Sequence, residues 1–329
     1  MRHLAVLVLI AIGGCSSRET VVVYSPHGPD VQADYVAMFE EAYPHIDVNW
    51  IDSGSQEILN RITSERNRPA CDVWWGAPST MFMIAAKDGL LAPYTPTWAD
   101  RVAPDFKDPD HHWYGIYTTP LAILYNDRHY KQEDVPQTWD ELLDPKWKGK
   151  ITIRRAPPSG TMRTFIGAMI LRQPNEDAGI EWLGKLHEQT KDYMENPGLL
   201  FDHIKRREDL ITVWIMPDAV LQRRRNNIPF GYHVPKQTPV LTEGIAIVRD
   251  APHRTNAELF YEFVTTVDTL THQAEAYAKI PARSDIDRSL LPDWMTAQEI
   301  DPMPIDWVAF SEKEAAWTDR WKREVFEAR

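Results

Sequence analysis

Strand-like and helix-like segments alternate between residues 20 and 89, and this alternation constrains the fold more than any other feature of the sequence. Three short apolar runs with β-branched and aromatic residues are typical of buried strands, at 20–25, 45–52 and 71–76. Each is followed by a segment with apolar residues at helical spacing, at 30–44, 53–66 and 78–89. Repeated strand–helix pairs predict an α/β fold with a parallel, doubly wound sheet.

A second set of alternating segments follows the first. Strand-like runs recur at 120–126, 150–156 and 209–217, with helical patterns between them at 158–173 and 176–190. A lone strand at 240–248 returns late in the chain and precedes another helical segment. Two α/β sets in succession with one late strand predict two sheets in two lobes, joined by more than one crossing of the chain.

The N-terminus has the pattern of an export signal. Two polar residues, Arg2 and His3, precede an apolar run over 4–12 that is too short to span a bilayer, so residues 1–15 are expected to be a signal peptide. The sequence Ile-Gly-Gly-Cys ending at Cys15 resembles a bacterial lipobox. A lipid on Cys15 would tether a periplasmic or extracytoplasmic domain to a membrane. The alternative is an ordinary signal peptide followed by an unmodified cysteine.

Cysteine content and charge narrow the class further. Only Cys15 and Cys71 are present, so a lipidated Cys15 leaves no pair for an internal disulfide, and Cys71 is expected to be an inert buried thiol. The chain has 36 basic and 48 acidic residues, a formal net charge of −12. An acidic exported protein is a poor candidate for binding nucleic acid.

Residues 140–153, DELLDPKWKGKITI, resemble a stretch shared by bacterial solute-binding proteins, the extracytoplasmic receptors of ATP-driven (ABC) importers. Further segments resemble the same family: 21–28, 69–80, 120–126, 240–248 and 280–286. The resemblance covers essentially the whole mature chain and is strongest to the ferric-ion, thiamine and sugar-phosphate binders. It implies a type II-like, two-lobed periplasmic binding protein fold, with hinge strands joining two doubly wound sheets. The expected lobes are 19–117 with 243–295, and 118–242 with 296–329.

Ligands of such sheets sit at the carboxyl ends of strands, where loops enter helix N-termini. This rule and the family resemblance together give the candidate ligand-binding residues: Ser25, His27, Ser53, Ser55, Trp75, Ser79, Thr80, Ser159, Gly160, Thr161, Trp214, Met216 and Glu243. Several of the hydroxyls are equally well explained as helix caps. Arg155 or Arg163 is expected to add a bidentate partner for an anion.

The two tryptophans of the third strand are expected to differ in role. Neighbours on a strand point to opposite faces, so Trp74 is assigned to the core. Trp75 is the last residue before Gly76, and we expect it to offer a stacking surface to the ligand.

The sequence departs from the ferric-binding pattern in two places. Those relatives carry adjacent tyrosines where this chain has Trp214, Ile215 and Met216, and a glutamate in the loop after the third strand, where this chain has none. Iron is therefore not favoured, because a hard cation needs oxygen ligands. An organic solute with an anionic end and a less polar portion fits better: an organophosphate, phosphonate, carboxylate or thiamine-like molecule.

The predicted function is solute capture for an ABC transporter permease, by a monomer without enzymatic activity, cofactor or metal. His111 and His112 lie in a polar turn without an obvious third ligand, so no metal site is predicted there. The alternatives are a ferric-ion receptor, a binder of an apolar or lipid-like ligand, a receptor for a membrane sensor, and an exported enzyme. The sequence contains no Gly-x-Ser-x-Gly, His-Glu-x-x-His or P-loop motif.

Overall fold

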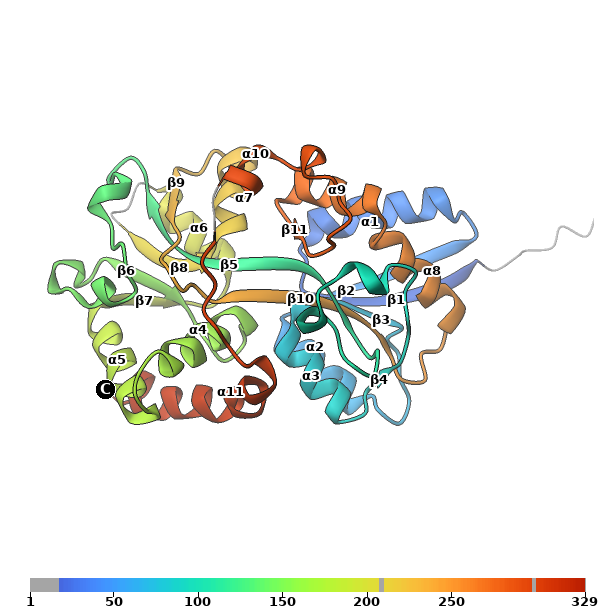
Figure 1. Ribbon diagram of the computed structural model, residues 1–329, viewed down its shortest axis with the longest axis horizontal. Coiled ribbons are helices and arrows are strands. Elements are labelled where there is room, and N and C mark those ends of the chain that lie inside the picture. Colours follow the sequence, from blue (N-terminus) through green and yellow to red (C-terminus); the bar gives the residue numbers. More distant parts are fainter. Residues whose placement is uncertain (1–17, 207–209, 298–299, 329) are drawn as a thin grey trace, which may run out of the picture.

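The computed structural model describes residues 18–206, 210–297 and 300–328. The expected signal peptide and Cys15 lie outside these ranges. Figure 1 shows two lobes side by side, linked by two long strands, β5 (Tyr114–Asn126) and β10 (Val240–Val248). These two strands pair antiparallel along residues 114–120 of β5, and we call them the connecting strands. The two-lobed α/β architecture expected from the sequence is confirmed.

The first lobe contains the strands and helices that the opening alternation predicted. Its strands are β1 (Glu19–Ser25), β2 (Ile46–Asp52), β3 (Val73–Pro78) and β4 (Leu91–Ala92). Its helices are α1 (Pro29–Ala42), α2 (Ser55–Ser64), α3 (Ser79–Lys87), α8 (Arg254–Val264) and α9 (Val267–Tyr277). Strand β1 lies between β2 and β3 and is parallel to both, as predicted, whereas β10 joins β3 antiparallel.

The second lobe continues the same hydrogen-bonded sheet through β5. Its strands are β6 (Ile151–Arg154), β7 (Thr190–Met194), β8 (Ile211–Ile215) and β9 (Phe230–His233). Its helices are α4 (Gly160–Leu171), α5 (Glu176–Gln189), α6 (Pro197–Lys205), α7 (Met216–Asn226) and the C-terminal α11 (Trp307–Trp321). The strand order through both lobes is β2-β1-β3-β10-β5-β8-β6-β7. In the described sheet, the connecting strands therefore join the strands of the first lobe to those of the second.

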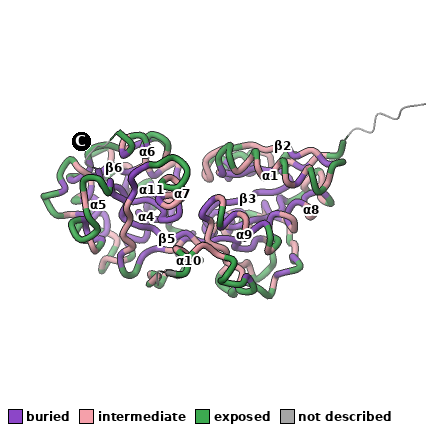
Figure 2. The backbone as a smooth tube through the Cα atoms, turned by 90° about the horizontal axis from the view of Figure 1, so that it is seen from above, coloured by how far each residue is buried: buried purple, intermediate pink, exposed green. Residues whose placement is uncertain are grey.

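Two short elements complete the chain, β11 (Ile280–Pro281), which pairs with β5, and α10 (Asp293–Ala297). Figure 1 shows α10 beside α7 of the second lobe, so the chain crosses between the lobes before α10, and the segment after α10 runs over the second lobe to α11. Figure 2 shows buried strands at the centre of each lobe and exposed residues on the outer helices and loops. Cys71 is buried, and burial raises the pKa of its thiol well above the ordinary value, which confirms the expected inert thiol.

Trp74 and Trp75 point to opposite faces of β3, and both side chains are fully buried, with exposed fractions of 0%. Trp74 lies on Phe82 of α3, with ring centroids 4.3 Å apart, so its assignment to the core is confirmed. Trp75 packs against Tyr35 of α1 and Phe260 of α8. The prediction that Trp75 offers a stacking surface is wrong, because Tyr35, Trp50 and Phe260 enclose the indole and leave no part of it exposed.

Candidate functional site

Five side chains form a group on one face of the connecting strands, which we call the polar cluster: His27, Tyr117, Thr119, Glu243 and Lys279. Glu243 is its centre, since its carboxylate accepts hydrogen bonds from Lys279 Nζ at 3.1 Å and Thr119 Oγ1 at 3.0 Å. His27 Nε2 lies 3.5 Å from Glu243 Oε2. The Lys279 ammonium also lies over the Tyr117 ring, 5.4 Å from its centroid.

Burial and charge set the protonation states in the polar cluster. Burial would raise the pKa of Glu243, but the Lys279 ammonium and His27 hold it well below its ordinary value, so Glu243 is a carboxylate. Burial, reinforced by Lys279, lowers the pKa of His27 and keeps its imidazole neutral at pH 7. The polar cluster therefore combines a carboxylate, an ammonium and a neutral imidazole.

The His27 ring is held in place by its neighbours and is open to a further partner. It meets Trp75 edge-on at 4.9 Å between centroids and lies directly over Gly76, where any Cβ would be 2.7 Å from the ring. Within the described ranges, neither ring nitrogen makes a hydrogen bond, although the side chain is buried. A buried polar atom in this state is unusual and points to a partner outside the protein chain.

A second polar group lies at the ends of β6 and β8 in the second lobe. Asp218 accepts a hydrogen bond from Trp214 Nε1 at 2.7 Å, and the Arg154 guanidinium lies over the Trp214 ring at 5.4 Å. Arg154 Nε is buried and has no hydrogen-bond partner in the described part of the chain. Burial raises the pKa of Asp218, against the opposing effects of Trp214, Lys279 and Arg154, so Asp218 lies within electrostatic reach of both polar groups.

The lobes meet where helix α4 begins. Ser159 caps this helix by accepting a hydrogen bond from Met162 N at 3.3 Å. A Cβ on Gly160 would lie 2.9 Å from Cγ of Pro78, the residue before α3 in the other lobe. Only glycine permits this close approach, so Gly160 is a point of contact between the lobes.

The same boundary contains a buried ion pair. Glu314 of α11 is fully buried, and burial raises the pKa of its carboxyl although Arg163 opposes that effect. Arg163 Nε lies 3.9 Å from Glu314 Oε1. Thr80 of the first lobe lies near this carboxyl, because α3 packs against α11. This group places one predicted residue, Thr80, in an interlobe contact.

The other predicted residues take separate positions. Ser25 is buried and its Oγ accepts from His27 N at 3.2 Å. Ser53 Oγ donates to Glu57 Oε2 at 2.5 Å beside the start of α2, so its hydroxyl serves that helix end. The residues that begin a helix or lie in its first turn are Ser55 of α2, Ser79 of α3, and Gly160 and Thr161 of α4.

Two expectations about side-chain direction need correction. Met216 was among the candidate ligand-binding residues, but as the first residue of α7 it lines a cavity with Pro120 and Val240 instead of joining the polar cluster. Arg155 was one expected anion partner, but its Nη1 donates to Glu195 at 2.6 Å. Its neighbour Arg154 takes the place beside Trp214, because alternate residues of an extended segment point to opposite sides.

Sequence reasoning missed Lys279, Arg154 and Asp218. Lys279 lies 36 residues beyond Glu243 and reaches it only through the pairing of β11 with β5. The arginine pair at the end of β6 was a visible signal, but which of the two faces the site depends on the register of one strand.

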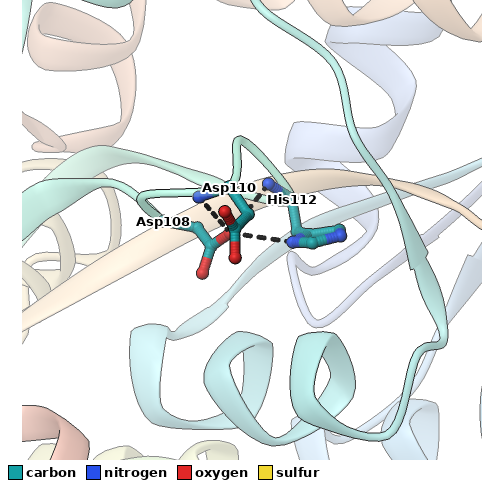
Figure 3. A group of neighbouring side chains, drawn as sticks. All are labelled: Asp108, Asp110 and His112. Atoms are coloured by element: carbon teal, nitrogen blue, oxygen red, sulfur yellow. Dashed lines mark hydrogen bonds and ion pairs between the residues drawn. The ribbon is translucent and has the colours of Figure 1, made fainter.

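Among the described residues, Asp108, Asp110 and His112 come close enough to share a metal ion (Figure 3). One oxygen, Asp108 Oδ2, already accepts from the backbone N–H groups of Asp110 and His112 and lies 2.8 Å from His112 Nδ1. His111 points elsewhere, with Nδ1 2.6 Å from the Tyr114 hydroxyl. The group is explained by the turn that it closes.

No helix in the described ranges is both long enough and apolar enough to cross a membrane.

Two lobes that enclose unpartnered polar groups at their boundary define a class of protein, the two-lobed solute-binding proteins. The sequence model of the bacterial extracellular solute-binding proteins matches residues 78–301. The chain belongs to this family, whose members bind substrates, and the class expected from the sequence is confirmed.

Individual relatives agree with this assignment. The chain is 23% identical to a probable ABC transporter periplasmic-binding protein of Sinorhizobium fredii, over 97% of this chain and 90% of that protein. The fold is similar to that of the periplasmic binding protein AfuA from Actinobacillus pleuropneumoniae with fructose-6-phosphate bound, with a TM-score of 0.84, 24% identity, and coverage of 95% and 100%. It is also similar to iron-bound HitA from Pseudomonas aeruginosa, with a TM-score of 0.80, 20% identity, and coverage of 92% and 99%.

Proposed function

We propose that this protein is the substrate-binding component of an ABC importer and that it captures a small organic anion between its lobes. The proposal rests on the unpartnered polar atoms at the boundary, the His27 ring nitrogens in the first lobe and Arg154 Nε in the second. Leaving such atoms buried and unpaired costs roughly 1–3 kcal/mol each. An anionic oxygen of the solute would accept a hydrogen bond from Arg154, and a solute hydroxyl would donate one to the acceptor nitrogen of the neutral His27 ring.

The solute class follows from the chemistry of these groups. Arginine matches the geometry of phosphate, phosphonate and carboxylate groups, so we assign the anionic end of the solute to Arg154. The Trp214 indole, itself buried, holds the Arg154 guanidinium that lies over its ring. Glu243 and Lys279 are available to hydroxyl groups, as in a sugar phosphate. The bound fructose-6-phosphate of AfuA shows that this fold accommodates such a molecule.

Ferric ion is the weaker candidate, although HitA shows that the fold also binds iron. Segment 214–216 contributes an indole, an isoleucine and a thioether, and none of these is a hard oxygen ligand. Glu243, the central carboxylate, is already paired with Lys279.

The protein is proposed to act outside the cytoplasm. Lipidation at Cys15 would hold the domain at a membrane outside the cytoplasm, where a monomer delivers its solute to an ABC permease. We propose that the solute is released unchanged, without catalysis and without a cofactor.

Mass spectrometry of protein purified from its native host tests the function, because a captured solute co-purifies. Thermal-shift measurements with fructose 6-phosphate, simple phosphonates, carboxylates and ferric citrate then define the class. A solute at 100 times its Kd stabilises the protein by about 2.7 kcal/mol. We expect a shift with a phosphorus- or carboxylate-containing organic anion that is lost in His27→Gln. A shift with ferric citrate alone would contradict the proposal, as would chemical conversion of the solute.

A further inference from the structure

A cavity of about 970 Å³ lies beside the connecting strands, apart from the polar cluster. Its walls come from both lobes, with Met83 and Trp113 from the first and Met216 from the second. The segment between α10 and α11 forms a further wall. This segment is fixed by backbone hydrogen bonds from Thr238 N to Asp301 O at 3.0 Å and from Met303 N to Thr238 O at 2.8 Å.

Strand alternation separates the cavity from the proposed solute site. Thr118 and Pro120 of β5 line the cavity, whereas the residues between and before them, Thr119 and Tyr117, belong to the polar cluster. Likewise Ile280 lines the cavity, and its neighbour Lys279 binds Glu243. Successive side chains of a strand point to opposite faces, so the connecting strands divide two separate environments.

The chemistry of the cavity differs from that of the polar cluster. The apolar part of the wall includes four aromatic residues, Phe106, Trp113, Trp294 and Trp307, and four methionines, Met83, Met216, Met295 and Met303. The charged residues among the described lining are three carboxylates, Asp105, Asp108 and Asp306, and one ammonium, Lys107. Asp108 closes its own turn and Asp306 caps α11, so Asp105 is the carboxylate that we assign to a bound cation. Lys107 Nζ donates to Ala99 O at 2.8 Å.

Aromatic rings and carboxylates around an apolar space are the groups that recognise organic cations, because ring faces and carboxylates both attract positive charge. The volume is within the range of small-molecule sites. We propose that this cavity is a second binding site, which takes an apolar organic cation such as an alkylammonium. The site is distinct from the anion site proposed above and is expected to work when that site is disabled.

Octylammonium and octanoate test the proposal, since they share a chain length and differ in the sign of their charge. Isothermal titration calorimetry is expected to show octylammonium binding at least about tenfold tighter than octanoate, from the excess of carboxylates. Shortening the chain should weaken binding by up to about fourfold per methylene. Equal binding of the two amphiphiles, or tighter binding of octanoate, would overturn the assigned class.

Variants locate the site. Met303→Lys places an ammonium in the cavity and should weaken octylammonium binding at least about tenfold, whereas Leu199→Lys on the exposed surface of α6 should leave it unchanged. Asp105→Asn should reduce the preference for octylammonium over octanoate. Arg154→Gln should keep octylammonium binding intact, which separates this site from the proposed solute site. Octylammonium binding that is unaffected by Met303→Lys would place it elsewhere.

Hydrogen–deuterium exchange on the unmodified protein gives a readout that does not depend on a variant folding. Octylammonium should slow exchange in segments 104–109 and 300–308, which line the cavity. Protection confined to other segments would overturn the proposal.

Discussion

The two faces of the connecting strands differ in chemistry, one polar and one largely apolar, although their side chains alternate along the same two strands. On one face, Glu243 is paired with Lys279 and lies beside His27, whose ring nitrogens have no hydrogen-bond partner in the described chain. On the other face, Thr118, Pro120 and Val240 border a largely apolar cavity. The contrast shows how strand alternation lets one pair of strands serve two binding environments, and how a shift of one residue would exchange them.

Replacing either tryptophan of β3 tests whether both faces of this neighbouring strand belong to the core, unlike the two faces of the connecting strands. Both are fully buried, so Trp74→Ala and Trp75→Ala should each lower the free energy of unfolding by about 3–5 kcal/mol. Urea denaturation measures this loss. If Trp75→Ala left stability unchanged and only weakened solute binding, Trp75 would belong to the site and our assignment of it to the core would fail.

Removing the central carboxylate tests the polar face directly. Glu243→Ala leaves Lys279 without its partner and should destabilise the protein by about 3 kcal/mol. The matched change Thr242→Val lies next to it on the opposite face and should cost about 1 kcal/mol or less. Equal losses in urea denaturation would show that the two faces do not differ in this way.

A methyl group at the interlobe contact should affect closure more than stability. The Cβ of Gly160→Ala would meet Pro78 at 2.9 Å, so solute binding should weaken by about 1–2 kcal/mol. Gly184→Ala in α5 is the control, because its Cβ would meet nothing within 4 Å. An unchanged solute affinity in Gly160→Ala would mean that the lobes need not approach at this point.

The smallest predicted effect is a pH dependence of protein stability that arises from the polar cluster. The pKa of His27 lies below its ordinary value of 6.5, so the unfolded chain binds the proton first and stability falls as the pH drops below about 6.5. The slope is at most about 1.4 kcal/mol per pH unit. His27→Gln should remove this phase of the thermal-melt profile. Glu243, whose pKa is also lowered, adds a further loss below pH 4.5.

Periodicity was sufficient to predict the architecture but not the direction of single side chains. The span of β10 was predicted in full, and α1, α2, α3 and α4 within a few residues, because each has a clear apolar pattern. His27 was proposed from the loop after the first strand and Glu243 from the late returning strand, yet their contact joins residues far apart in the chain. The choice of Arg154 over Arg155, and the side taken by Met216, depend on register, which a single sequence does not fix.

Trp75 illustrates a different limit. Its position at the carboxyl end of a strand favoured exposure to ligand, but coverage by α1 and α8 depends on how far those helices extend over the sheet. Lys279 reached the site from a short strand without a hydrophobic pattern of its own.

The central claim, an anion site between the lobes, is tested most directly by native mass spectrometry of three proteins purified in the same way: the unmodified chain, Arg154→Gln and Arg155→Gln. The two arginines are neighbours, but only Arg154 lies beside Trp214, while Arg155 binds Glu195. We predict that the unmodified protein and Arg155→Gln retain the same co-purifying anionic solute and that Arg154→Gln loses at least about nine-tenths of it, a factor of ten or 1.4 kcal/mol. Equal occupancy in Arg154→Gln would contradict the claim.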